Sequence, residues 1–320
     1  MPRFDRVVCL LGVHLVTLAA AASASADPLG ANYDPPIGSQ WTLHSQWRED
    51  DTRIGKTTTM TVTYTAQFTI EEKTPGGFRI SYVMRDLDIQ GSTSQAALSK
   101  ILLQPQIGVV AQIDADQNGK PVRVENFPEV QAAYQKGVAD AVAAIAAHAS
   151  PESASKARAI LDANTPQDAE KAAEKVDDLS LLSLAQNAGL SLNEVRSGSQ
   201  ISSSPFSAEP ISTTTSLSLT SNDVASGKQM LVRTETYDPI ALKRYALDAF
   251  KKLSPDAAAK MDEIAAQMST TRVDRAEFTV ERGMTTGVAE DTTLEIKEAD
   301  LTMTKRQRKE VTVTPWRPTP

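Results

Sequence analysis

The chain has 320 residues, of which 41% are hydrophobic and 23% are charged, a balance typical of a folded protein rather than a disordered one. Its net charge of -7 at pH 7 argues against nonspecific binding of nucleic acid, because phosphate backbones attract basic surfaces. Aromatic residues make up only 5% of the chain, so we expect a core rich in aliphatic side chains and alanine.

The first 26 residues have the pattern of a secretory signal peptide. Arg3 and Arg6 precede an apolar run from Val7 to Ala22, and Ala24-Ser25-Ala26 fits the small-residue site of signal peptidase cleavage. We therefore predict cleavage after Ala26, a mature chain that begins at Asp27, and a periplasmic or secreted location.

The only cysteine, Cys9, lies inside this predicted signal peptide. A lipid-modified cysteine must follow the apolar region, so the pattern does not indicate a lipoprotein. The predicted mature chain has no cysteine, which excludes disulfides, thiolate nucleophiles and cysteine metal ligands from it. An uncleaved membrane anchor is the alternative, but His14 interrupts an apolar run that is already short for a span of about 20 residues. No later segment is apolar enough to cross a bilayer as a helix, so we expect no stable transmembrane insertion after cleavage.

Alternating apolar and polar residues predict strands in the first part of the chain. The clearest pattern runs over residues 60–71, where every second residue is apolar, as in a strand with one buried face and one wet face. Pro75-Gly76-Gly77 predicts a turn, and the alternation resumes at 78–89 with a change of phase that suggests a bulge near Arg85-Asp86. An earlier strand is expected around Trp41–Trp47, and a hairpin over 109–124.

The middle of the chain has the sequence pattern of helices. Four capping residues are followed by proline, a pairing that starts helices because the missing N–H of proline is unpaired there anyway. These pairs are Ser150-Pro151, Thr165-Pro166, Asp238-Pro239 and Ser254-Pro255. The expected helices are 128–149, 151–162, 166–188, 239–253 and 255–268. Beyond residue 270 the chain returns to strand patterns at 278–280, 294–296, 301–303 and 311–313.

The predicted fold is α+β: twisted antiparallel β-sheets, or a half-barrel, in two similar β-rich halves that are covered by helices. The expected divisions are a signal peptide at 1–26, a β-rich half at 27–126, a helical insertion at 127–190, a β/α half at 191–314 and a flexible tail at 315–320. Short recurrences suggest a duplication, such as Gly38-Ser39-Gln40 with Gly198-Ser199-Gln200, and Thr57–Thr59 with Thr213–Thr215. Chance matches are equally compatible with such Ser- and Thr-rich segments.

One segment matches the EF-hand calcium loop in full. Asp114, Asp116, Asn118 and Glu125 occupy the oxygen-ligand positions, with Gly119 at the turn. The flanking sequence has strand alternation instead of the two helices that an EF-hand requires. We therefore interpret the segment as a hairpin turn and predict no metal site there, with calcium binding as the minor alternative.

Residues suited to catalysis or to cofactor binding are scarce. Only His44 and His148 remain after the predicted cleavage, and neither has a partner at metal-ligand or triad spacing. Nucleophile-elbow and phosphate-loop patterns do not occur. The sequence therefore predicts a protein that is not an enzyme and that needs no cofactor.

Positive charge is concentrated only at 305–309. Lys305, Arg306, Arg308 and Lys309 could contact an anionic lipid surface, which attracts each positive charge by about 1 kcal/mol. The favoured interpretation is a solvated turn between the strand patterns at 301–303 and 311–313, in which the charges discourage edge pairing.

The long strand patterns, alanine-rich helices and hairpins over 38–313 resemble exported bacterial proteins of the lipoprotein-carrier type, whose half-open β-barrel wraps around helices. The hairpin Asp116-Gln117-Asn118-Gly119-Lys120-Pro121-Val122 is also similar to a D-x-x-G-x-hydrophobic hairpin of uncharacterised exported families. The resemblance rests on pattern and carries over no binding residue. It implies an apolar groove for a lipid or a lipoprotein tail.

These observations predict an exported, non-catalytic protein that binds an apolar or amphipathic ligand between sheet and helices. The alternative is a structural or assembly protein of the cell envelope. The expected partner is accordingly a lipid or an envelope protein, and an enzyme or a calcium-binding protein is least favoured.

Overall fold

The computed structural model of the protein describes residues 33–53, 55–91, 94–186, 188–204, 207–253, 268–298 and 301–315. The predicted signal peptide lies outside these ranges. So do residues 255–267 of the last predicted helix and residues 316–320 of the predicted tail. Met268, where that helix was expected to end, is the first residue of a strand.

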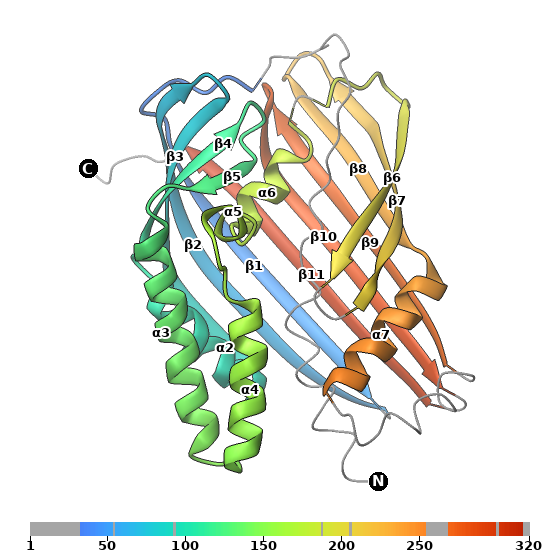
Figure 1. The fold of residues 1–320 in the computed structure, drawn as a ribbon. Coiled ribbons are helices and arrows are strands. Elements are labelled where there is room, and N and C mark those ends of the chain that lie inside the picture. The colour runs from blue at the N-terminus through green and yellow to red at the C-terminus, as the bar shows by residue number, and fades with distance from the viewer. Residues whose placement is uncertain are drawn as a thin grey trace.

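The described strands form one antiparallel sheet in the order β5-β4-β3-β2-β1-β11-β10-β9-β8-β7-β6 (Figure 1). The strands are β1 (Gln40–Arg53), β2 (Lys56–Thr74), β3 (Gly77–Gly91), β4 (Val110–Asp116), β5 (Pro121–Val124), β6 (Val195–Ser204), β7 (Ser207–Asp223), β8 (Lys228–Tyr237), β9 (Met268–Glu281), β10 (Met284–Glu298) and β11 (Leu301–Pro315). Strands that follow one another in sequence pair with each other, except β5 and β6, and β1 also pairs with β11 in the middle of the sheet. The sheet is open, with β5 and β6 at its two edges among the described strands.

The helices lie on one face of this sheet, which we call the inner face (Figure 1). They are α2 (Ser94–Leu103), the 3-10 turn η1 (Gln104–Gln106), α3 (Phe127–Ala146), α4 (Pro151–Asn164), α5 (Ala169–Ala173), α6 (Asp177–Ser183) and α7 (Pro239–Leu253). Helix α2 packs on β3, α5 on β5, α6 on β10, and α7 on β7 and β9. Of the described helices, none is long and apolar enough to cross a membrane.

Period-two alternation places the apolar residues of each strand on the inner face. On β2, Met60, Val62, Ala66, Phe68 and Ile70 are buried, while the threonines between them face away from the helices. This confirms the strand predicted at 60–71, which the structure extends at both ends. The strand expected around Trp41 and the hairpin expected over 109–124 are also confirmed, as β1 and as the β4–β5 pair.

Two local irregularities predicted from the sequence are present. The register between β2 and β3 shifts where Thr63 pairs with Asp88 but Thr65 pairs with Arg85, and Asp86 has a positive φ of 49°. This is the bulge expected near Arg85-Asp86. At the preceding turn, Gly77 has a φ of 152° and lies so close to the backbone of β4 that a Cβ would collide with it, so this position requires glycine.

The core consists of two apolar clusters on the inner face. The larger one joins the sheet to α5 and α6, and its fully buried members include Leu43, Ile70, Ile80, Ile113, Ala173, Phe278 and Val311. The smaller one joins α7 to β7 and β8 through Ile211, Tyr237, Leu242 and Tyr245. Leu242 and Tyr245 lie three residues apart on α7, so they share one face of the helix.

The helix starts follow the predicted caps at two places. The Ser150 hydroxyl accepts a hydrogen bond from the Ser153 N–H at 3.2 Å, and the Asp238 carboxylate accepts one from the Ile240 N–H at 2.8 Å. The helix predicted over 166–188 is wrong, because the chain forms two short helices there. Asp168, not Thr165, caps α5, and Val176 has the non-helical φ and ψ of -85° and 66° that separate α5 from α6.

One further expectation about the fold is corrected. The described chain is mainly β rather than α+β in two clear halves: its strands form a single open sheet, and β11 continues through the charged run 305–309 that was expected to form a turn. The matched segments of the suggested duplication lie at different registers: Thr57–Thr59 pair with 50–52 of β1, far from Gln40, whereas Thr213–Thr215 pair directly with Gly198–Gln200.

A candidate ligand-binding face

The inner face changes from apolar to charged along each central strand. On β1, buried Leu43 and Ser45 are followed on the same face by Trp47, Glu49 and Asp51. The pairing register carries this change across the sheet, since Ser45 lies opposite Val311 whereas Trp47 lies opposite Lys309. The result is a band of charged inner-face residues that crosses the sheet from β1 to β8.

We call this feature the charged band. Its acids and bases are equal in number: Glu49, Asp51, Glu235, Asp274 and Glu290 against Arg53, Arg233, Arg272, Lys305 and Lys309. Burying ionised groups is costly unless each is paired and hydrogen-bonded. The contacts within the band show how far this requirement is met.

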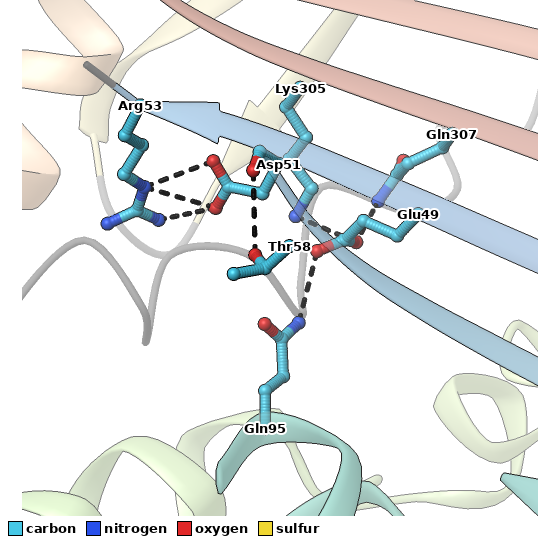
Figure 2. Close-up of polar contacts among 7 residues, drawn as sticks. All are labelled: Glu49, Asp51, Arg53, Thr58, Gln95, Lys305 and Gln307. Atoms are coloured by element: carbon cyan, nitrogen blue, oxygen red, sulfur yellow. Dashed lines mark hydrogen bonds and ion pairs between the residues drawn. The ribbon is translucent and has the colours of Figure 1, made fainter. Parts of the chain in front are cut away.

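At the β1 end of the band, the carboxylate of Glu49 is fully satisfied (Figure 2). It accepts hydrogen bonds from Gln307 at 2.8 Å and from Gln95 of α2 at 3.2 Å, and it lies 2.9 Å from the ammonium of Lys305. Burial lowers the pKa of Lys305, and the Glu49 carboxylate offsets part of this effect. The next pair along β1, Arg53 with Asp51, is joined at 3.0 Å. This end of the band therefore fastens α2 to the middle of the sheet.

Near the centre, Asp178 of α6 collects three donors from the sheet. Ser45 donates to it at 3.3 Å, Tyr64 donates through its hydroxyl, and the ammonium of Lys309 lies 2.7 Å away. Burial alone would lower the pKa of Lys309, but the carboxylates of Asp178 and Asp177 raise it above its ordinary value. Lys309 is therefore protonated and serves as a counterion that holds α6 on the sheet.

On β9, Arg272 and Asp274 form a buried pair with two hydrogen bonds, at 3.0 and 2.8 Å. The hydroxyl of Tyr237 on β8 also donates to Asp274 at 2.7 Å, and the guanidinium of Arg272 lies 4.6 Å from the centre of the Tyr237 ring. Tyr237 also belongs to the smaller apolar cluster, so this polar group borders that cluster.

Glu290 occupies the middle of the band on β10, opposite Lys309 on β11. Burial raises the pKa of its carboxyl, and the nearby Lys309 only partly counteracts this effect. Burial here therefore favours the protonated acid.

Half-buried apolar side chains border the charged band on the inner face. Trp47 lies opposite Lys309, Leu294 lies opposite Lys305, and Ile296 pairs with Met303 beyond the band. The face thus presents apolar and charged groups side by side, which is the chemistry that an amphipathic molecule requires.

The predicted calcium loop forms a β-hairpin, and its acids serve separate contacts. Asp116 accepts hydrogen bonds from the N–H groups of Asn118 and Lys120, whereas Asp114 pairs with Arg79 at 3.0 Å. Glu125 pairs with Arg123 at 3.1 Å. The Glu125 N–H bonds to the carbonyl of Gln112, four residues from Asp116, which corresponds to roughly 13 Å along a strand.

The basic run at 305–309 lies within β11, so the expected turn is wrong. Strand alternation sends Lys305 and Lys309 to the inner face, where they meet Glu49 and Asp178. Arg306 and Arg308 lie on the opposite face, and Arg308 pairs there with Glu310 at 2.7 Å. The four cations proposed for an anionic surface therefore do not form a single patch.

The two histidines that follow the predicted signal peptide lie apart from the charged band. His44 is exposed on the outer face of β1, and His148 is exposed just beyond α3. Within the described ranges, no three His, Cys, Asp or Glu side chains are grouped as metal ligands.

Sequence reasoning missed the charged band. An acid and a base two residues apart recur within it, as in Arg272 and Asp274, but the same spacing occurs in the exposed pair Arg275 and Glu277. The sequence signal that could have found the band is the two-residue alternation of β9. Arg272 and Asp274 fall on the same face of the strand as the apolar Ala276 and Phe278, whereas Arg275 and Glu277 fall on the opposite face.

No family model matches the chain, and no curated protein matches it. Among solved structures, the chain is similar to lipovitellin, described in terms of its lipid–protein interactions, with 7% identity and a TM-score of 0.46. That match covers 89% of this chain but only 26% of the lipovitellin chain. An outer membrane channel from Pseudomonas putida F1 is similar with 8% identity and a TM-score of 0.18, over 91% of this chain and 100% of the channel. At these TM-scores the likenesses carry no argument about fold or function.

Proposed function

We propose that this protein is exported and binds an amphipathic ligand on the inner face of its sheet, without catalysing a reaction. The observation that carries this proposal is that half-buried apolar side chains border the charged band on the inner face. These side chains are Trp47, Leu294, Ile296 and Met303. A purely apolar ligand would leave the charged groups next to it desolvated, whereas an amphipathic one would match both parts of the face.

A non-catalytic role is supported by the pairing within the band. Glu49, Asp178 and Asp274 each hold at least two hydrogen-bond donors or cations, so their lone pairs are engaged in structural contacts. Lys309 is held as an ammonium between carboxylates and is therefore not a base. A nucleophile with an adjacent general base would instead require a free, deprotonated partner.

Ligand binding is tested with methyl oleate and 1-monooleoylglycerol, using native mass spectrometry and tryptophan fluorescence, to which Trp47 contributes. We expect saturable binding to the mature protein. Met303→Asp should weaken it strongly, since it places a charge on the apolar border. Thr302→Asp, next to it on the exposed outer face, should leave binding unchanged. Binding that is absent, or equal in the two variants, would overturn the proposal.

The location is supported by the pattern of residues 1–26 and is tested by N-terminal sequencing of the protein from its native source. We expect Asp27 as the first residue. An intact Met1, or a lipid on Cys9, would contradict export with cleavage after Ala26.

A role in envelope assembly is the second candidate, and it is favoured by the edges of the sheet. The β5 edge has only four residues and begins with Pro121, two features that discourage further pairing. The β6 edge has ten residues, without proline and with Arg196 as its only charge. Copurification of a stable protein partner, with no bound lipid in the mass spectrum, would favour assembly over ligand binding.

A further inference from the structure

Four buried polar atoms without a hydrogen-bond partner lie together on β7 and β8. They are Thr213 Oγ1, Thr215 Oγ1, Arg233 Nε and Glu235 Oε1. Thr215 lies directly opposite Glu235, Thr213 lies opposite Tyr237, and Arg233 precedes Glu235 by one inner-face position. The four atoms therefore belong to a single patch that is two strands wide.

This patch differs from the rest of the charged band. At the β1 end, the carboxylate of Glu49 has three partners, whereas one oxygen of Glu235 has none and the other is held by the terminal nitrogen of Arg233. Buried polar groups are nearly always hydrogen-bonded, and unpaired ones need a specific explanation. Since both strands carry such atoms on the inner face, we look for one hydrogen-bonding partner that can reach both strands from that face.

The surroundings of the patch are apolar at both ends. Towards the larger cluster, Leu217 lies opposite Arg233 and Leu219 lies opposite Leu231. Towards α7, Ile211 and Leu242 belong to the smaller cluster. A polar group bound here would thus have apolar neighbours for the chain attached to it.

The charges of the patch determine which kind of polar ligand group can bind there. Arg233 is already paired with Glu235, and the neighbouring Arg272 with Asp274, so neither an anion nor a cation would find an uncompensated counterion. The unmade hydrogen bonds are one donor from Arg233, one acceptor on Glu235 and two hydroxyls that can do both. Alcohol hydroxyls donate and accept at once and match this set.

We propose that Thr213, Thr215, Arg233 and Glu235, the hydroxyl subsite, bind the neutral, hydroxyl-bearing head group of an amphipathic ligand, of glycerol or sugar type. This inference rests on the proposed function and specifies the head group that the charged band receives. The alkyl chain of the ligand would extend along Leu294, which packs against the smaller cluster, towards Ile296.

The experiment compares two probes with the same chain: 1-monooleoylglycerol, with two free hydroxyls, and methyl oleate, with none. We expect the mature protein to bind the glycerol ester about five- to tenfold more tightly, the effect of about one hydrogen bond. Thr215→Val keeps the shape of the side chain and should abolish this preference by weakening only the glycerol ester. Thr214→Val, on the exposed face of the same strand, should change neither affinity.

Heat stability without ligand provides the second measurement. Removing a buried hydroxyl that has no partner should leave the melting temperature of Thr215→Val equal or higher. A lower melting temperature would show that the hydroxyl is already satisfied by ordered water and would overturn the subsite. Should Thr215→Val fail to fold, Thr213→Val makes the same comparison. Equal affinity for both probes would overturn the subsite alone, whereas binding of neither probe would overturn the proposed function itself.

Discussion

The ammonium of Lys309 on β11 lies 2.7 Å from the carboxylate of Asp178 on α6, and both side chains are largely removed from solvent. Ser45 and Tyr64 also donate to this carboxylate, so these polar contacts hold α6 on the sheet together with its leucines in the larger apolar cluster. The stability of the α6 packing should therefore depend in part on the neutralisation of the Lys309 charge by Asp178, with Asp177 further away at 3.9 Å.

Replacing Asp178 by Ala should destabilise the protein by about 3 to 5 kcal/mol, because it leaves the charge of Lys309 buried without its nearest partner. Denaturant unfolding measures this change. The double variant Asp178→Leu with Lys309→Met should recover part of the loss, since it removes both charges. Arg308→Met, next to Lys309 but in an exposed pair, is the control and should have little effect. A similar loss in the control would contradict this assignment.

The buried tyrosines predict a loss of stability in alkali. Burial raises the pKa of Tyr64 and Tyr82 well above 10.0 in the folded protein, while an unfolded tyrosine ionises near that value. Above pH 10 the folded state thus holds more protons than the unfolded state, so stability is full below this pH and falls as pH rises further. Tyrosinate absorbance in a pH titration should appear together with unfolding. Ionisation of most tyrosines in the folded protein would contradict the prediction.

The folded protein should be more stable at neutral pH when an amide replaces the carboxyl group of Glu290. Its folded pKa is raised above 4.5 by burial, so the unfolded state releases the proton first, and stability falls as pH rises from 4.5 through the folded pKa. Glu290→Gln imitates the protonated acid and should raise the melting temperature at pH 7 but not at pH 4. Glu277→Gln, exposed on the neighbouring strand, should show no such pH-dependent gain. A Glu290→Gln variant less stable at pH 7 would refute this account of the charged band.

The 114–125 hairpin should not bind calcium at micromolar concentrations. Asp116 already accepts two backbone hydrogen bonds in the turn, and the hairpin holds Glu125 away from it. The bidentate glutamate that an EF-hand needs is therefore not available to an ion at Asp116. Calorimetric titration with calcium, on the native protein and on Asp114→Ala, makes the measurement. Saturable micromolar binding that is lost in the variant would show that the hairpin rearranges.

Local patterns in the sequence predicted much of the sheet and of the helix starts. The alternation from Met60 to Ile70 depends only on neighbours two residues apart, and the cap at Ser150 depends only on the next three residues. The break at Val176 was not predicted, because it accompanies contacts that Asp178 makes with strands more than a hundred residues away in sequence. Such long-range contacts leave no local pattern.

The charged band was hidden for the same reason. The sequence placed Lys305 and Lys309 in a solvated basic turn, because a run of charged residues usually lies in an exposed segment. Their acidic partners are Glu49, 256 residues before Lys305, and Asp178, 131 residues before Lys309. The pairing of β1 with β11 brings Glu49 to Lys305, and the packing of α6 on the sheet brings Asp178 to Lys309; local sequence encodes neither contact.

The position of β11 between β1 and β10 also determines the order in which this sheet can be completed during synthesis. The strands on the β1 side and those on the β10 side are joined by hydrogen bonds only through residues 301–315, which the ribosome makes last among the described strands. Until then, β1 and β10 each have an open long edge, a state prone to mispairing. A chain shortened before Leu301 would retain both sides of the sheet but not the seam between them.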